Sequence, residues 1–433
     1  MLAPGGGGDG GMEHEPDLDL KSPANVRDPF PAYRWLRDHE PIHRSESLNA
    51  WAVTRYSDVL EIFEQPQRFS SDRFRKIDER YVSDRPAVQA VSAVLRDWLV
   101  FRDPPDHTRL RALLQKTFTP RQLEGSRERI QGTIDALLDP VAERGEGDFI
   151  RDFAFPLPAM VIALLLGAPT EDIEPIKAWS DQLAAYLGGS VEGRDNFDEA
   201  HAGVSKLVAY FRGLLEERRR RPRDDLMSLM LRAEHEGQKL GEEELVANCV
   251  LLLFAGHETT TNVLGNGLFH LLRHPDQLAA LRADPAPFPR AVEELLRYDG
   301  PVPATIKIAT EDVAWRGRRI RAGDMVLPFL ASANRDPRQF TDADALDVRR
   351  APNRHLAFAF GIHFCLGAPL ARLEARLAFE SLLRRFRRLE LATNDPPWKP
   401  QIFLRGLEAL PLRCEPAGAT GNSAARPRAG RAR

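Results

Sequence analysis

The sequence predicts a mainly α fold with a minor β region, built as one large domain. Helical periodicity covers most of the chain, whereas strand-like alternation is confined to short pieces. A chain of 433 residues would ordinarily divide into two or three domains, since single cores usually stop growing beyond ~250–300 residues. No Gly/Ser-rich or Pro-rich linker and no internal repeat divides this chain, so we expect a single domain over residues 23–416.

Apolar residues recur at three- and four-residue spacing in successive segments, which is typical of amphipathic helices. One helix begins at Tyr56-Ser57-Asp58, and another begins at Asp106, directly after Asp103-Pro104-Pro105. The other predicted helices cover residues 121–138, 156–166, 170–186, 197–220, 224–235, 242–273, 275–282, 289–298 and 366–385. Short alternating pieces predict strands at residues 51–54, 305–310, 312–319, 326–329 and 404–412.

The composition excludes several classes of protein. A formal net charge of -3 argues against a nucleic-acid-binding protein, which would carry a strong basic excess. No apolar run approaches the ~18 residues of a membrane helix, and no secretory signal opens the chain, so we expect a cytoplasmic protein. Residues 1–22 and the basic segment 417–433 have little to bury and are expected to be disordered tails. Three cysteines cannot form a disulfide framework or a four-thiolate metal site.

The most informative segment surrounds Cys365, which directly precedes a predicted helix. The free N–H groups and the dipole of a helix start stabilise negative charge, so Cys365 is placed to be a thiolate. Gly361 and Gly367 flank it and leave room for a flat ligand or a second backbone. Three aromatic residues are positioned to keep water from the sulfur: Phe358, Phe360 and Phe364.

Taken alone, this cysteine has several interpretations. A buried structural thiol is the ordinary role of a single cysteine, and we expect that role for Cys249 and Cys414. A catalytic cysteine with His363 as its base is a second possibility. A zinc site would need more ligands than the neighbourhood supplies.

The segment from Phe358 to Gly367 resembles the haem-binding signature of the cytochrome P-450 superfamily, in which Phe, Gly, a basic residue, Cys and Gly fall at this spacing. The resemblance implies a cytochrome P-450 fold that encloses haem b, contacted by Phe358 and Gly367. It also implies that Cys365 is the axial thiolate ligand of the iron. Ala359 departs from the family pattern, because many members carry a glycine there, and this turn is expected to be stiffer.

Other family motifs follow in the expected order along the chain. Glu294 and Arg297 lie at i and i+3 on one helix face, a pattern that alone indicates only a surface ion pair. The resemblance implies instead a buried structural pair completed by Arg350. In the helix over 242–273, two small residues and a hydroxyl share one face, at Ala255, Gly256 and Thr259. Close helix packing would explain that pattern, but it resembles the family's oxygen-binding groove, with Glu258 and Thr259 as the acid-alcohol pair that relays protons.

The two haem propionates require cations. His107 and Arg111 lie at i and i+4 on one helix face, which by itself is a solvated basic face. By resemblance they bind the propionates together with His363 and Lys307, where the family most often has Arg. A lysine still neutralises a propionate as a point charge, without the bidentate fork of an arginine.

The resemblance therefore implies a monooxygenase that inserts one atom of O2 into a hydrophobic fatty acid, terpenoid, steroid or polyketide-type molecule. Electrons would come from a separate ferredoxin or flavodoxin with its NAD(P)H-dependent reductase. The enzyme itself is expected to be a monomer. Its docking candidates are Arg102, Arg109, Arg354 and Arg372. The apolar part of residues 81–99 is expected to line the substrate pocket, together with Leu251, Ala255, Thr259, Val302, Ala304, Phe403 and Leu404. The alternatives are a peroxygenase or isomerase on the same fold, a cysteine hydrolase, and a haem-based sensor or carrier.

Overall fold

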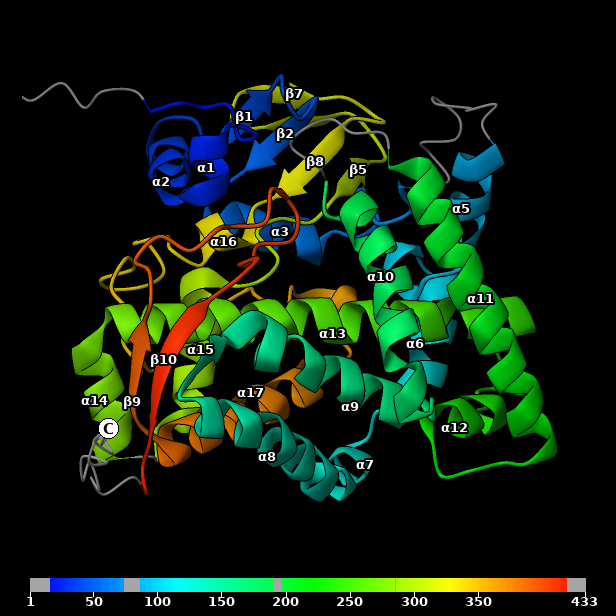
Figure 1. Cartoon of the computed structure of the whole chain (residues 1–433). Coiled ribbons are helices and arrows are strands. Elements are labelled where there is room, and N and C mark those ends of the chain that lie inside the picture. Colours follow the sequence, from blue (N-terminus) through cyan, green and yellow to red (C-terminus); the bar gives the residue numbers. More distant parts are fainter. Residues whose placement is uncertain (1–15, 74–85, 190–195, 285, 419–433) are drawn as a thin grey trace, which may run out of the picture.

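The structure is a computed structural model that describes residues 16–73, 86–189, 196–284 and 286–418 (Figure 1). The helices of its first half are α1 (Pro23–Arg27), α2 (Phe30–His39), α3 (Tyr56–Glu64), α5 (Pro86–Arg96), α6 (Asp106–Gln115), α7 (Pro120–Gly125), α8 (Arg127–Arg144), α9 (Pro156–Leu166), α10 (Ile173–Leu187) and α11 (Phe197–Arg220). Those of its second half are α12 (Leu226–Arg232), α13 (Glu242–Arg273), α14 (Pro275–Ala283), α15 (Phe288–Asp299), α16 (Leu330–Ala333) and α17 (Ala368–Arg385).

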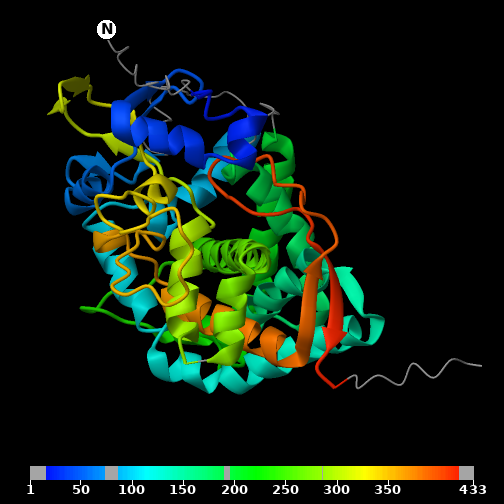
Figure 2. The same cartoon turned by 90° about the vertical axis from the view of Figure 1, so that its left-hand side faces the viewer.

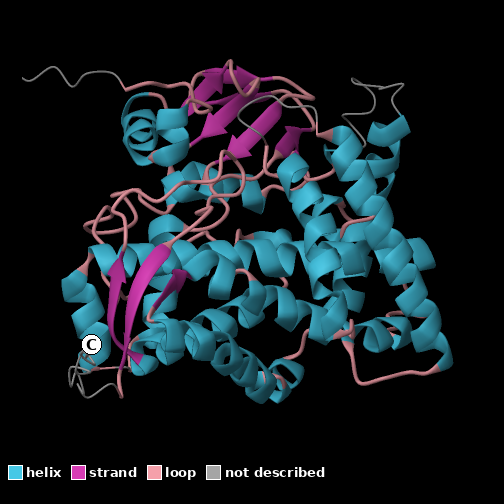
Figure 3. Cartoon of the chain, in the orientation of Figure 1, coloured by secondary structure: helices cyan, strands magenta, loops and turns pink. Residues whose placement is uncertain are grey.

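The strands gather in two regions at the edge of the helical body (Figure 3). One sheet has the order β1-β2-β8-β5-β3, in which only the β2 and β8 pair is parallel. Its strands are β1 (Ile42–Ser45), β2 (Ala50–Val53), β3 (Phe69–Ser70), β5 (Lys307–Ala309) and β8 (Met325–Pro328). The second sheet has the order β4-β10-β9 and consists of β4 (Glu146–Asp148), β9 (Phe386–Leu391) and β10 (Pro411–Pro416). A separate hairpin pairs β6 (Val313–Trp315) with β7 (Arg318–Ile320).

Helix α13 forms the axis of the molecule, and Figure 2 views it nearly end-on in the centre. Three glutamates occupy its first turn and a histidine and an arginine its last, which complements the helix dipole at both ends. Its 32 residues span about 48 Å, and most of its side chains are buried on every face. It packs against α9, α11, α15 and α17, so residues placed on α13 lie deep inside the fold.

Most of the helices that the periodicity predicted lie within three residues of their observed bounds, whereas α1, α2, α5 and α16 were not predicted. Helices α9, α11 and α13 have the predicted bounds, whereas the predicted helix over 121–138 is divided at Ser126 between α7 and α8. The strand predicted over 404–412 is wrong for most of its length, because Leu404–Leu410 pack as irregular chain and β10 begins only at Pro411. The alternation of apolar and polar residues in that segment reflects burial of every second side chain, and a buried irregular chain can show the same alternation as a strand.

The N-terminal boundary of the ordered chain lies before residue 23. Leu20 is buried against α2, and the Asn25 side chain donates hydrogen bonds to the carbonyl oxygens of Asp17 and Asp19. Residues 16–22 therefore belong to the fold, and the rest of the predicted N-terminal tail lies outside the described residues. In the described ranges, none of the helices combines the length and the apolar character needed to cross a bilayer.

Candidate active site

The loop that carries Cys365 is held in a strained backbone conformation. Gly361 has φ of 70°, and a β-carbon there would lie 2.8 Å from the carbonyl oxygen of Phe63 on α3, so only glycine fits. Ala359 has φ of 57°, which is unfavourable for a residue with a side chain. The Cys365 N–H then donates to the Phe358 carbonyl at 3.0 Å and aims the residue at the start of α17.

The start of α17 does not by itself make Cys365 a thiolate. Burial raises the pKa of the thiol, while the N–H groups of Gly367 and Ala368 and the guanidinium groups of Arg111 and Arg372 lower it in part. The net shift is upward, which corrects the expectation drawn from the helix dipole alone. A bound metal cation would reverse it, because a coordinating thiol is deprotonated. The other two cysteines are buried packing residues, as predicted.

Cys365 and α13 line one cavity of about 290 Å³. From the cysteine side it is lined by Phe358, Gly367 and Cys365, and from α13 by Leu251, Ala255, Gly256 and Thr259. Gly256 also packs closely against α9, because a β-carbon there would lie 3.0 Å from Ile162 Cγ1. The space between a thiol and a helix groove of small residues suits a flat ligand such as haem.

Glu258 and Thr259 do not point into the same space. The Thr259 hydroxyl lines the cavity of Cys365 and donates to the Ala255 carbonyl at 2.8 Å. The Glu258 carboxylate is buried beside a separate cavity, where Lys399 Nζ donates to Oε1 at 2.5 Å and Asn262 does so at 3.5 Å. Burial alone would raise the pKa of Glu258, but the charge of Lys399 holds it below the usual value.

Three basic side chains, His107, Arg111 and His363, line the cysteine cavity, and Lys307 joins them through Ser71. The rings of His107 and His363 lie 4.2 Å apart, and Ser71 Oγ accepts from Lys307 Nζ at 2.5 Å and contacts His363 Nε2 at 3.0 Å. Arg111 Nη1 donates to the Phe364 carbonyl at 2.6 Å. The structure thus brings together the four residues that the sequence predicted would share one ligand.

This basic cluster fits an anionic ligand. Burial, with the nearby cations, lowers the pKa of His107 to about 4 and that of His363 to about 2, and burial lowers the pKa of Lys307 to about 8. Both ring nitrogens of His107 are buried without a hydrogen-bond partner among the described residues. No described carboxylate forms an ion pair with any of the four. Two propionates would supply the missing acceptors and negative charge, so these residues fit haem.

A buried network holds the segment that precedes the cysteine loop against α15. Arg297 donates to both carboxylate oxygens of Glu294, at 2.7 and 2.8 Å, and both side chains are fully buried. Arg350 Nε donates to the same carboxylate at 3.1 Å, as does Asn353. The remaining N–H groups of Arg297 and Arg350 bind backbone carbonyls of residues 334–345. These contacts are those of a structural lock rather than of a reacting group.

Several predicted residues lie elsewhere. Val302 lines the cysteine cavity, but Ala304, Phe403 and Leu404 do not; Ala304 and Phe403 pack with the α2 cluster, and Leu404 belongs to the main core. Phe360 is 43% exposed and does not line the cysteine cavity, whereas Phe364 lines it but is still 37% exposed. Residues 81–85 lie outside the described residues.

Three of the four candidate docking arginines are engaged within the chain. Arg102 pairs with Asp97, Arg109 with Glu244, and Arg372 with Glu293. Arg354 is exposed.

Sequence reasoning missed two polar residues, Ser71 and Lys399. Ser71, directly after β3, joins the basic cluster, and Lys399 pairs with Glu258 across 141 positions. Neither stands in a motif or in a periodic pattern, so only the tertiary fold reveals them.

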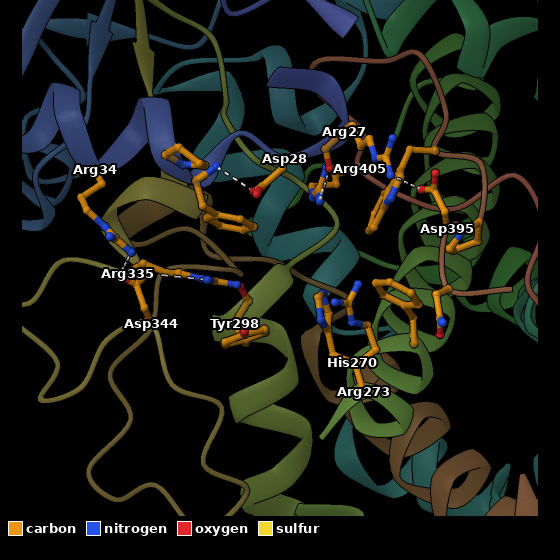
Figure 4. Close-up of a pocket in the computed structure, with 16 residues that line it drawn as sticks. Arg27, Asp28, Arg34, His270, Arg273, Tyr298, Arg335, Asp344, Asp395 and Arg405 are labelled. Carbon is orange, nitrogen blue, oxygen red and sulfur yellow. Dashed lines mark hydrogen bonds and ion pairs between the residues drawn. The ribbon is translucent and has the colours of Figure 1, made fainter. Parts of the chain in front are cut away.

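A further pocket of about 480 Å³ lies at the N-terminal helices and is rich in arginine (Figure 4). Arg335 lies between the rings of Phe30 and Tyr298, 3.6 and 3.7 Å from their centroids. Arg405 stacks on Trp398 at 3.9 Å and donates to two backbone carbonyls of α1. These arginines fasten the N-terminal segment to the core, and the pocket shares no residue with the cysteine cavity.

Comparison with known proteins agrees with this geometry. The family profile "Cytochrome P450" matches residues 77–285 and 288–409. The chain is 39% identical over 393 residues to the polyketide biosynthesis cytochrome P450 PksS of Bacillus subtilis, covering 89% of this chain and 95% of that protein. It is 40% identical to vitamin D(3) 25-hydroxylase of Pseudonocardia autotrophica, covering 93% and 97%.

A solved structure shares the same fold over nearly its whole length. The crystal structure of P450BioI with hexadec-9Z-enoic acid ligated acyl carrier protein superimposes with a TM-score of 0.84 at 38% identity, covering 90% of this chain and 99% of that chain. The cysteine loop, the groove of α13 and the basic cluster thus stand in a known architecture. The chain therefore belongs to the cytochrome P450 family, as a monooxygenase of the bacterial type whose cofactor is haem iron.

Proposed function

We propose that the chain is a haem b monooxygenase that hydroxylates or epoxidises a hydrophobic small molecule. In a hydroxylation, substrate RH, O2, two electrons and two protons give ROH and water. Bound haem supplies the activation of O2. The observation that carries the proposal is the single cavity into which Cys365 faces from one side and Thr259 from the other.

The residues of the chain would hold the cofactor at both of its polar features. Cys365 would ligate the iron, and the basic cluster of His107, Arg111, Lys307 and His363 would neutralise the propionates. Ser71 holds two of these residues, Lys307 and His363, through hydrogen bonds to its hydroxyl group. Phe358, with Arg372 stacked 4.5 Å above its ring, would shield the sulfur in place of the exposed aromatic residues.

Proton supply would run along α13. Glu258, paired with Lys399, is ionised and can accept a proton from its own solvent-connected cavity. The Thr259 hydroxyl, one residue further, can hold a proton donor inside the cysteine cavity. Because the two groups face different spaces, a water or a rearranged Glu258 side chain must complete the transfer.

The substrate would be a mainly apolar molecule that carries a hydrogen-bonding group. The upper part of the cavity is lined by apolar side chains, among them Leu99, Leu251, Val263 and Val302. Thr305 Oγ1 is buried there without a partner among the described residues, and it can bind one hydroxyl or carbonyl group. Fatty acyl, polyketide-type and steroid-like molecules meet this description, and the names of the relatives refer to the same classes.

A separate ferredoxin or flavodoxin, reduced by an NAD(P)H-dependent reductase, would deliver the electrons to a monomeric enzyme in the cytoplasm. Phe360 and Ile362 are exposed on the cysteine loop, and the exposed Arg354 lies close to them in the sequence. These residues would form an apolar and basic docking surface for the electron donor. An acidic partner bound there would be released by salt.

The test combines a spectrum with turnover. The reduced protein with carbon monoxide should show the red-shifted Soret band of a thiolate ligand, and Cys365→Ala should abolish it. With 18-oxygen gas, a ferredoxin and its reductase, a hydroxylated product of a hydrophobic library compound should carry one labelled atom. Product formed with hydrogen peroxide alone, its oxygen coming from the peroxide, and no product from the reductase system would contradict the monooxygenase assignment and indicate a peroxygenase.

A further inference from the structure

The cavity that receives Glu258 is a separate acidic space beside α13. Its volume is about 730 Å³, and its polar lining includes Thr261 and Asn196. Its charged lining consists of the acids Glu174, Asp181, Glu199, Glu258 and Glu408 and the bases Arg151, Lys177 and Lys399. The excess of carboxylates favours a cation over an anion in this cavity.

Three potential metal ligands lie together beside this cavity, and two of them, Asp181 and Glu258, line it. Asp181 of α10 and His257 and Glu258 of α13 each place a ligand atom within 4.8 Å of the other two. Within the described ranges, no other group of three His, Cys, Asp or Glu residues meets this criterion. Ligands at ~2.0–2.2 Å from a tetrahedral ion lie ~3.3–3.6 Å apart, so the three ligand atoms would have to move closer together when an ion binds, and Asp181, which is exposed, has the most room to do so.

His257 supplies an observation that is independent of the carboxylates. The residue is 2% exposed, and its Nδ1 lies 2.9 Å from the Leu253 carbonyl, so Nδ1 carries the proton and Nε2 holds a lone pair. Nε2 is buried and has no hydrogen-bond partner among the described residues. Histidine ligands show this arrangement, with one ring nitrogen fixed by a carbonyl and the other free for the metal.

The neighbouring lysines leave one oxygen of each carboxylate for a ligand role. Both recorded hydrogen bonds of Glu258, from Lys399 and Asn262, reach Oε1. Lys177 approaches Asp181 Oδ2 at 3.6 Å, which is a loose contact. A bound cation would compete with Lys399 for the charge of Glu258, so this lysine should weaken metal binding without preventing it.

We propose that Asp181, His257 and Glu258 form a divalent metal site that takes Zn²⁺. One imidazole and two carboxylates, with water in the fourth position, form a ligand set that zinc accepts. Binding there would occupy the carboxylate that the proposed proton supply uses, so zinc would act as an inhibitor of turnover. The site itself does not depend on the proposed reaction, because binding is measured on the resting protein.

Equilibrium dialysis against Zn²⁺ tests the site, using the haem-loaded full chain. We expect His257→Phe, which keeps an aromatic ring but removes the ligand nitrogen, and Asp181→Asn, which removes the carboxylate charge, to lower the affinity at least about tenfold. Lys399→Gln should raise it. His39→Ala is the matched control, because His39 makes the same Nδ1 contact to a carbonyl four residues earlier but belongs to no such ligand group in the described chain.

Thermal unfolding and the carbon monoxide spectrum verify that each variant is folded. If folded His257→Phe and Asp181→Asn bind as much Zn²⁺ as the wild type with equal affinity, the ion is adventitious and the site is refuted. If zinc inhibits turnover of the wild type but of neither variant, the site is supported as well. If the wild type shows no monooxygenase activity at all, the proposed function fails, but the dialysis result still decides whether the metal site exists.

Discussion

Glu258 and Thr259 are adjacent on α13, but their side chains enter different cavities. Successive residues on a helix differ by about 100° in direction, so the hydroxyl faces the cysteine cavity and the carboxylate faces Lys399. The helix thus separates a solvent-connected acid from the reaction space. The proposed proton supply must cross from one side to the other at this point.

Thr259→Ala should leave haem binding intact and uncouple electron consumption from product formation. Without the hydroxyl, no group of the chain holds a proton donor at that position, and a positioned acid-base group typically contributes ~10²–10⁴-fold. We expect less product per NAD(P)H consumed and more hydrogen peroxide. Thr133→Ala is the control, because Thr133 makes the same hydroxyl bond to the carbonyl four residues earlier, on α8. Full coupling in Thr259→Ala would contradict the role.

The motifs of the sequence were enough to locate the catalytic elements, because their chemistry requires several residue types at fixed spacing. The cysteine loop and α13 lie where the sequence placed them, and Glu294, Arg297 and Arg350 meet as expected. Contacts between isolated residues were not predictable. Lys399 reaches Glu258 from a distant irregular segment, a position that no local pattern encodes.

Burial also changed the electrostatics that the sequence suggested. A helix start predicts a thiolate at Cys365, but desolvation outweighs the backbone donors, and the balance depends on tertiary packing. The exposure of Phe360 and Phe364 likewise depends on how the folded loop places them, which their spacing does not indicate.

Lys307→Ala should weaken haem retention, because it removes the buried cation that Ser71 holds in the basic cluster. We expect the rate of haem transfer to apomyoglobin to rise about tenfold, as for the loss of a charge-assisted hydrogen bond of ~1.5 kcal/mol or somewhat less. Lys206→Ala, on the exposed face of α11, should transfer haem at the wild-type rate. An unchanged rate for Lys307→Ala would remove this residue from the propionate site.

Ala359→Gly should stabilise the protein. The left-handed backbone costs a residue with a β-carbon ~1–2 kcal/mol, and glycine removes this cost. Glycine also has more freedom in the unfolded chain, which offsets ~0.4–1 kcal/mol of the stabilisation. The expected net increase in the free energy of unfolding is about 0.5–1 kcal/mol, measured by urea denaturation. Gly361→Ala should act in the opposite direction, since its β-carbon would meet the Phe63 carbonyl. Equal stability of both variants and wild type would show that the loop relaxes freely.

Arg350→Ala should be strongly destabilising, although the residue lies outside the cavity. It leaves the Glu294 carboxylate, which is fully buried, with one guanidinium instead of two. Breaking such a buried pair typically costs ~3–5 kcal/mol, and the cysteine loop would lose its anchor to α15. The neighbouring exposed Arg349 provides the control, because Arg349→Ala removes a positive charge without touching Glu294. Similar melting temperatures for the two variants would refute the structural lock.

Glu293 should set the acid limit of stability. Burial raises the pKa of its carboxyl, but the hydrogen bonds and charges of His355 and Arg372 outweigh burial and lower it from 4.5 to about 2. A carboxyl with a lowered pKa in the folded state stabilises the fold fully above its unfolded pKa, and this stabilisation is lost as the pH falls from 4.5 towards 2. Glu293→Gln should therefore lower the urea concentration at the unfolding midpoint at pH 7. The decline of this midpoint between pH 5 and 3 should be shallower in the variant than in the wild type. Glu128→Gln, at an exposed site on α8, should keep the wild-type slope. If Glu293→Gln loses stability with acid as steeply as the wild type, other carboxyl groups control the transition, and the link from α15 through His355 and Arg372 to the cysteine loop contributes little.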